Sequence, residues 1–306
     1  MAKSNPAALV ESFKRLAELA FRVTTTQLVH PARFKMNVPE GYTYENFNAV
    51  GHPTVWSTIR HFEIARLLGF WADTGDNFLD MRKIDKMIFI ASLKLSCDPG
   101  LYNPDMKKQP VETDNELVYV GKTSFKIRSN LFLSQAKGAM VQQDISFVMV
   151  DTETRRPTVP PAWWVDKFAP YSLPNEGPIK ANHLNFSNWT GKVYDEEYVV
   201  RSMDLDAYFH LNNICFIRIC YEAYVSSFVR QFGHANEADA FRNVKDLSCI
   251  FRGEARLGDL LKISFAVDPN DEDTCHFLIM NGSRLIFQCL IKFFRDSFLF
   301  YSFGQK

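Results

Sequence analysis

Neither sign of charge prevails in this chain, which has 35 basic and 35 acidic residues among its 306. Nucleic-acid-binding proteins carry clustered excess positive charge, so the balance argues against a nucleic-acid partner. No run of 18 consecutive apolar residues is present, and we therefore expect no membrane-spanning helix. Apolar residues make up 46% and charged residues 23% of the sequence, which is ordinary for a folded globular protein and excludes wholesale disorder.

Cysteine pairs are also absent, since none of the six cysteines forms a CxxC motif. No two Cys or His residues have the spacing of zinc ligands, so we expect no metal site and thiols that stay reduced. The N-terminus lacks the long apolar segment and cleavage site of a secretory signal. Residues 7–22 predict an amphipathic helix that includes Glu11 and Glu18, and mitochondrial presequences avoid acids. A cytoplasmic location is therefore the expectation, with a processed organellar form left open.

One short motif occurs twice in the chain. Residues 204–213 read Asp-Leu-Asp-Ala-Tyr-Phe-His-Leu-Asn-Asn and lead into an apolar run that predicts a helix. Residues 46–52 read Asn-Phe-Asn-Ala-Val-Gly-His and also lead into an apolar run, and an Ile-Arg pair follows both histidines at the same distance. The two copies are separated by about half of the chain, which indicates duplication of a whole domain and not a solenoid repeat.

Both copies are followed by runs rich in β-branched and aromatic residues, which are typical of strands. The Asn-Gly pair at 281–282 lies between two apolar runs and predicts a hairpin. Five prolines between Thr158 and Pro178 mark a connector with a short helix at 161–168. Each half is thus predicted to be one long helix and an antiparallel sheet, with strands near 87–97, 117–134 and 139–151, then near 193–202, 244–254, 258–268, 273–280 and 283–295.

The second copy of the motif holds a carboxylate and an imidazole four residues apart, Asp206 and His210. Asn212 and Asn213 follow, and Asn is a favoured N-cap. The free backbone N–H groups of a first helical turn carry partial positive charge and can polarise a carbonyl or stabilise an oxyanion. A carboxylate and an imidazole beside such donors can activate water or attack a carbonyl. This pattern predicts acyl-transfer chemistry.

The first copy lacks these acids, because Asn46 and Asn48 stand in their places. An amide keeps hydrogen bonding but cannot act as a base or a carboxylate nucleophile. We therefore expect a silent copy in which His52 is structural and the helix and sheet form one wall of a substrate cavity. Arg60 and Arg218, on the helices that follow the two copies, could bind a phosphate, but ordinary ion pairs are the favoured interpretation.

With its helix, the second copy resembles the hotdog-fold acyl thioesterases. It is most similar to the second domain of the acyl-ACP thioesterases, whose motif reads D-L-D-x-N-x-H-V-N-N-x-x-Y-I. Residues 251–256, Phe-Arg-Gly-Glu-Ala-Arg, resemble the family's Y-R-R-E-C-x strand, in which the Glu is catalytic. The resemblance covers both halves, roughly residues 28–306, although its specific part is these two motifs.

The resemblance implies roles for individual residues. Asp206 would be the nucleophile or the general base, and His210 would orient the thioester or protonate the leaving thiolate. Glu254 would position or activate the attacking water. Tyr208, Asn212 and Asn213 are the expected substrate-binding residues.

Three positions depart from the family pattern. Tyr208 stands where the family has Asn, Phe209 where many hotdog thioesterases have Gly, and Phe216 where the family has Tyr. These departures leave two alternatives open. One is a hotdog hydratase or dehydratase acting on acyl thioesters, and the other is a protein that binds acyl thioesters without turning them over.

Taken together, the sequence predicts an α+β protein of two tandem hotdog domains that form an internal pseudo-dimer. The expected boundaries are an N-terminal extension at 1–27, a first domain at 28–157, a connector at 158–182 and a second domain at 183–306. The expected function is hydrolysis of fatty-acyl thioesters of acyl carrier protein or coenzyme A at one C-terminal site, without a metal or redox cofactor. The apolar tail at 298–303 is expected to pack on the body or between two copies, which leaves a homodimer open.

Overall fold

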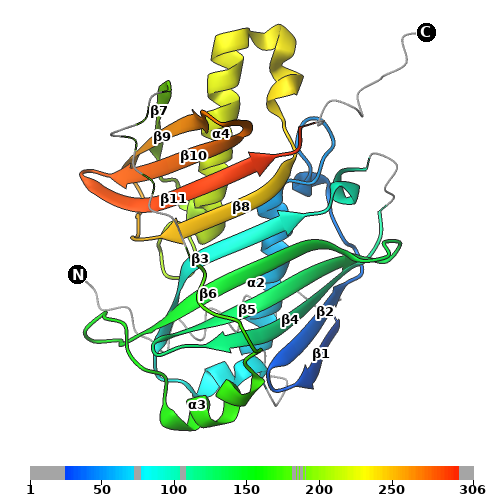
Figure 1. The fold of residues 1–306 in the computed structure, drawn as a ribbon, viewed down its shortest axis with the longest axis vertical. Helices are drawn as coiled ribbons and strands as arrows, with labels where there is room; N and C mark the ends of the chain where they lie inside the picture. The colour runs from blue at the N-terminus through cyan, green and yellow to red at the C-terminus, as the bar shows by residue number, and fades with distance from the viewer. Residues whose placement is uncertain are drawn as a thin grey trace. The chain divides into compact units, whose positions relative to one another are not determined.

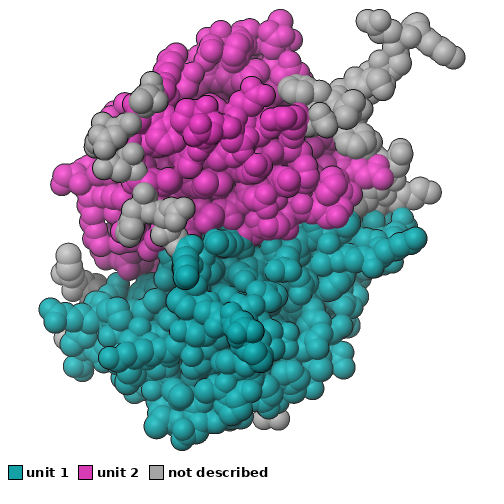
Figure 2. Space-filling model, in the orientation of Figure 1, with its two compact units in different colours: residues 1–41, 59–94, 108–180 teal, residues 42–58, 95–107, 181–306 magenta. Residues whose placement is uncertain are grey.

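The computed structural model describes residues 25–71, 77–103, 108–180, 184, 186, 189 and 191–295. It divides the chain into two compact units, coloured separately in Figure 2. The first unit comprises residues 1–41, 59–94 and 108–180, and the second comprises 42–58, 95–107 and 181–306. The predicted helix at 7–22 and the tail at 298–303 lie outside the described residues.

The first unit is an antiparallel sheet with a helix on one face. Its strand order is β1-β2-β4-β5-β6-β3, and α2 (Val55–Trp71) contributes residues 59–71. Aromatic rings join the helix to the sheet, since Phe70 packs edge-on against Phe147 of β6, which stacks on Phe125 of β5. The strands are β1 (Thr25–His30), β2 (Arg33–Val38), β3 (Met87–Cys97), β4 (Val111–Val120), β5 (Ser124–Leu133) and β6 (Ala139–Val150).

The second unit repeats this plan around one longer helix, α4 (Asn213–Phe232), which lies across a face of its sheet in Figure 1. Phe216 stacks on Phe287 of β11, and Tyr224 packs against Phe293 of the same strand, so the apolar side of the helix faces the sheet. The strand order is β8-β11-β10-β9-β7. These strands are β7 (Val193–Val199), β8 (Val244–Phe251), β9 (Leu260–Asp268), β10 (Asp271–Asn281) and β11 (Arg284–Phe293), and neighbouring strands in this order pair antiparallel.

The predicted mixture of helices and antiparallel strands is confirmed in both units. The short helix expected in the connector is α3 (Ala162–Phe168), whose Trp164 is fully buried and donates its ring N–H to the Leu79 carbonyl at 2.8 Å. Short 3₁₀ helices complete the described elements: η1 (Tyr44–Asn46), η2 (Phe78–Lys83), η3 (Pro99–Tyr102), η4 (Ala169–Tyr171), η5 (Ser202–Asp204) and η6 (His234–Ala240).

One strand prediction was wrong, and two strands were not predicted. The run at 117–134 is not one strand, because the Gly121 N–H bonds the Ser124 carbonyl at 2.7 Å and turns the chain between β4 and β5. Strands β1 and β2 were missed altogether, since their polar residues alternate with only a few buried ones. The six cysteines are free and buried.

Candidate active site

Asp206 and His210 lie in a compact turn that closes on itself. The Asp206 N–H donates to the His210 carbonyl at 2.8 Å, and the Phe209 N–H donates to the Asp206 carbonyl at 3.0 Å. The Asp206 side chain also stabilises the turn, because its Oδ1 accepts from the backbone N–H of Tyr208 at 2.8 Å and of His210 at 3.2 Å. An Asp side chain often folds back on its own backbone in this way. The turn fixes both groups relative to the helix that follows.

Helix α4 begins directly after this turn. Asn212 is its N-cap and accepts a hydrogen bond from the Ile214 N–H at 2.8 Å, which confirms the capping role expected of this asparagine. Asn213 opens the helix, and its side-chain nitrogen is buried with no hydrogen-bond partner among the described residues. His210 therefore lies beside the partial positive charge of a helix N-terminus, with an unsatisfied amide donor in the first turn.

Glu254 comes to this turn from a different part of the chain. Its Oε2 lies 3.3 Å from His210 Nε2, and the side chains are 39% and 12% exposed. Two backbone contacts hold the segment in place: the Leu211 N–H donates to the Ala255 carbonyl at 2.8 Å, and the Gly253 N–H donates to the Ile286 carbonyl at 3.1 Å. The two sequence motifs thus meet at one place. Glu254 follows the end of β8 at Phe251, so the predicted strand at 244–254 was three residues too long.

A buried ion pair forms at Asp204, next to the turn, and the sequence analysis did not predict it. Asp204 is 4% exposed, and its carboxylate accepts from Arg218 Nη2 at 2.6 Å and from the Tyr198 hydroxyl at 2.8 Å. The Arg201 N–H adds a third hydrogen bond at 2.7 Å. Burial raises the pKa of Tyr198 above its ordinary value, which keeps the phenol protonated as a donor. Arg218 also pairs with Glu222 at 2.7 Å, as ordinary ion pairing predicts.

The turn around Asn48 in the first half has the same local geometry. Asn48 Oδ1 accepts from the backbone N–H of Val50 at 3.2 Å and of His52 at 2.9 Å. The Asn48 N–H donates to the His52 carbonyl at 2.9 Å, and the Gly51 N–H donates to the Asn48 carbonyl at 3.0 Å. The two segments are therefore copies in hydrogen bonding as well as in sequence.

His52 is only 4% exposed in this first copy. Burial lowers its pKa, and a hydrogen bond with Asn243 opposes that shift without overcoming it. A buried neutral imidazole fits the structural role expected of His52.

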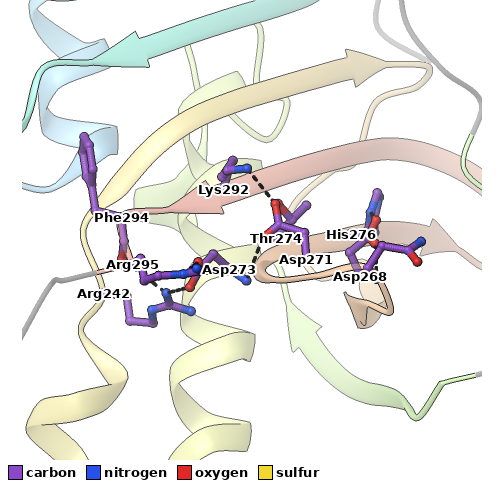
Figure 3. Close-up of polar contacts among 10 residues, drawn as sticks. Arg242, Asp268, Asp271, Asp273, Thr274, His276, Lys292, Phe294 and Arg295 are labelled. Carbon is purple, nitrogen blue, oxygen red and sulfur yellow. Dashed lines mark hydrogen bonds and ion pairs between the residues drawn. The ribbon is translucent and has the colours of Figure 1, made fainter.

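A second group of charged side chains lies at the end of the β9–β10 hairpin (Figure 3). Lys292 donates to Asp271 at 2.6 Å, and His276 Nε2 lies 2.7 Å from Asp268. Asp273 pairs with Arg242 and, at 3.1 Å, with Arg295. Burial raises the pKa of Asp273, but the two arginines outweigh that effect and lower it. Each acid has a basic partner, so this cluster fastens β10 to its neighbours.

The described residues contain no group of three or more His, Cys, Asp or Glu side chains placed to hold a metal ion. Within the same part of the chain, no helix is both long and apolar enough to cross a membrane.

No family model matches the chain, and no curated protein matches it. Solved structures do. The 12:0-ACP thioesterase from Umbellularia californica is 15% identical, covers 86% of this chain and 94% of its own, and has a TM-score of 0.64. An acyl-ACP thioesterase from Bacteroides thetaiotaomicron is 15% identical over 89% of this chain and 98% of its own, with a TM-score of 0.59.

An oleoyl thioesterase structure from Lactobacillus plantarum is 14% identical over 87% of this chain and 97% of its own, with a TM-score of 0.66. At these identities the likeness is one of fold. The chain folds like these acyl-ACP thioesterases over most of its length, which confirms the expected combination of helices with a large antiparallel sheet.

Proposed function

We propose that this protein hydrolyses fatty-acyl thioesters of acyl carrier protein or coenzyme A to a free fatty acid and a thiol. The observation that carries the proposal is the contact of Glu254 with His210, beside Asp206 and at the start of α4. The proposed architecture is a tandem of two hotdog domains, at 28–157 and 183–306, with one working site in the second. A homodimer stays a prediction.

The geometry supports a water-based mechanism. A carboxylate, Glu254 or Asp206, takes a proton from water, whose oxygen then bonds to the thioester carbonyl carbon. The negative charge that develops on the carbonyl oxygen is stabilised by the partial positive charge at the N-terminus of α4 and by the unsatisfied Asn213 side-chain amide. The carbon–sulfur bond breaks, and His210 delivers a proton to the leaving thiolate. Direct attack by Asp206 is the other route, with water then cleaving the acyl-enzyme.

The comparison of the two turns supports a chemical role for Asp206. Asn48 makes the same pair of hydrogen bonds in the first copy, so the turn requires only a side-chain acceptor. A negative charge at Asp206 is not needed for that purpose and is available for catalysis. Tyr208, which replaces the family Asn, is half-buried next to it and is the proposed substrate-binding partner.

The test is thiol release from acyl thioesters by the wild type and by Glu254→Gln. The substitution keeps the shape of the side chain and removes its charge, so we expect at least a hundredfold loss of kcat/KM, about the scale of general acid–base catalysis. Glu237→Gln is a matched control, because Glu237 forms a His–Glu contact at 3.1 Å with His234 on the exposed η6 helix. Equal activity in both variants would remove Glu254 from the mechanism.

A further inference from the structure

Phe209 occupies a conformation that few side chains accept. Its φ is +59°, in the left-handed region, and its side chain is 75% exposed. A residue with a Cβ is disfavoured in that backbone conformation, and the exposure of a phenyl ring to water does not stabilise the fold. In the first copy of the turn the same place is held by Gly51, with φ +80° and no atom within 4 Å of where a Cβ would lie. Strain at such a position points to a use for the side chain.

Two more exposed apolar side chains lie on the segments next to Phe209. Met203 is 91% exposed and Leu257 is 60% exposed. Backbone hydrogen bonds place these segments side by side, since the Val200 N–H bonds the Asp259 carbonyl and the Gly258 N–H bonds the Val200 carbonyl, both at 3.0 Å. We call Met203, Phe209 and Leu257 the entrance rim, because their segments flank His210 and Glu254.

Two arginines lie near Glu254, one on its own segment and one at the start of β11. Arg284 Nη2 donates to the Arg252 carbonyl at 3.2 Å, and its guanidinium carbon lies 3.4 Å from where a Cβ on Gly253 would be. Arg256 is exposed two residues after Glu254. The nearby Asp259 is engaged, because it accepts from the Arg256 N–H and from Asn281. Exposed guanidinium groups in this arrangement suit a phosphate.

We propose that the entrance rim binds the thiol-side arm of the substrate, a chain of methylenes and amides that ends in a phosphate held by Arg256 and Arg284. This inference rests on the proposed thioester substrate. An acyl chain gains most from burial away from water, whereas the arm must run outward from the reacting sulfur to a polar carrier. An exposed rim that is part apolar and part cationic matches the arm. Coenzyme A and acyl carrier protein share this phosphopantetheine chemistry.

The experiment measures binding of two S-octyl thioethers by calorimetry, one on pantetheine and one on coenzyme A. Neither has a carbonyl to hydrolyse. Phe209→Gly should weaken both ligands about tenfold, through lost apolar contact, while the thermal midpoint stays level or rises because strain is relieved. The double variant Arg256→Gln/Arg284→Gln should weaken only the coenzyme A ligand. Tyr44→Ala is the control, since Tyr44 is 94% exposed on the first-copy loop.

Unchanged affinities in Phe209→Gly, or no binding of either ligand by the wild type, would overturn the inference. Binding that depends on Phe209 in a protein that releases no thiol from acyl thioesters would uphold it and contradict the proposed hydrolysis instead. The same measurement with the thioether carried on acyl carrier protein distinguishes the two carriers. The carrier whose affinity falls in the double arginine variant is the one whose phosphate the arginines bind.

Discussion

Replacing Asp206 by Asn separates the structural role of this side chain from its chemical role. The amide oxygen can keep the hydrogen bonds to the N–H groups of Tyr208 and His210, because Asn48 makes the equivalent pair at 3.2 and 2.9 Å. We therefore expect the free energy of unfolding to change by no more than about 0.5 kcal/mol. The variant loses its base or nucleophile, so kcat/KM should fall at least about a hundredfold, or about 2.7 kcal/mol of transition-state stabilisation.

The assay follows thiol release with a chromogenic disulfide, beside thermal unfolding of the same samples. The reciprocal change, Asn48→Asp, is the control. It puts a carboxylate into the first copy of the turn and should leave the rate unaltered. If Asp206→Asn kept its thermal midpoint and turned over within about threefold of the wild type, the argument from the two turns would fail.

Two further predictions concern stability. Arg218→Gln leaves the buried Asp204 carboxylate without its cation and should cost about 3 kcal/mol in denaturant unfolding, whereas the added change Asp204→Asn should recover much of that loss. Burial lowers the pKa of His61 to about 4 from its ordinary 6.5. The contribution of the neutral imidazole to the free energy of unfolding is therefore complete above pH 6.5 and is lost as the pH falls toward 4. The free energy of unfolding should thus be about 2 kcal/mol smaller at pH 5 than at pH 8. A free energy of unfolding that does not change with pH in the wild type, or that changes equally in His61→Phe, would contradict this explanation.

Much of the site was predictable because its signals are local. The turn at 204–212 and its Asn212 cap depend on residue types a few positions apart, and the N-cap is one of the two asparagines that the sequence offered. Glu254 was found through the resemblance of a second short motif, and the fold then brought it to His210. Spacing alone would not have joined two segments so far apart in the sequence.

The ion pair of Asp204 next to this turn was not predicted, because it depends on packing between elements and not on residue types a few positions apart. Asp204 is held by Arg218 from α4 and Tyr198 from β7, and such a pairing depends on how the helix meets the strand. The sequence showed that Phe209 replaces a common glycine, but only the backbone shows its positive φ. In the first half, Gly121 could have indicated a turn inside the run that was predicted as one strand. It was not used, because the residues on both sides are typical of strands.

The most direct test of the proposed function is product analysis with the wild type over saturated acyl-CoA and acyl-ACP substrates of graded chain length. Thioester hydrolysis predicts free thiol and free fatty acid in equal amounts, with a rate that peaks at one chain length. Substrates that bind but yield neither product would contradict the proposal and leave a binding protein or a different acyl-thioester reaction in its place.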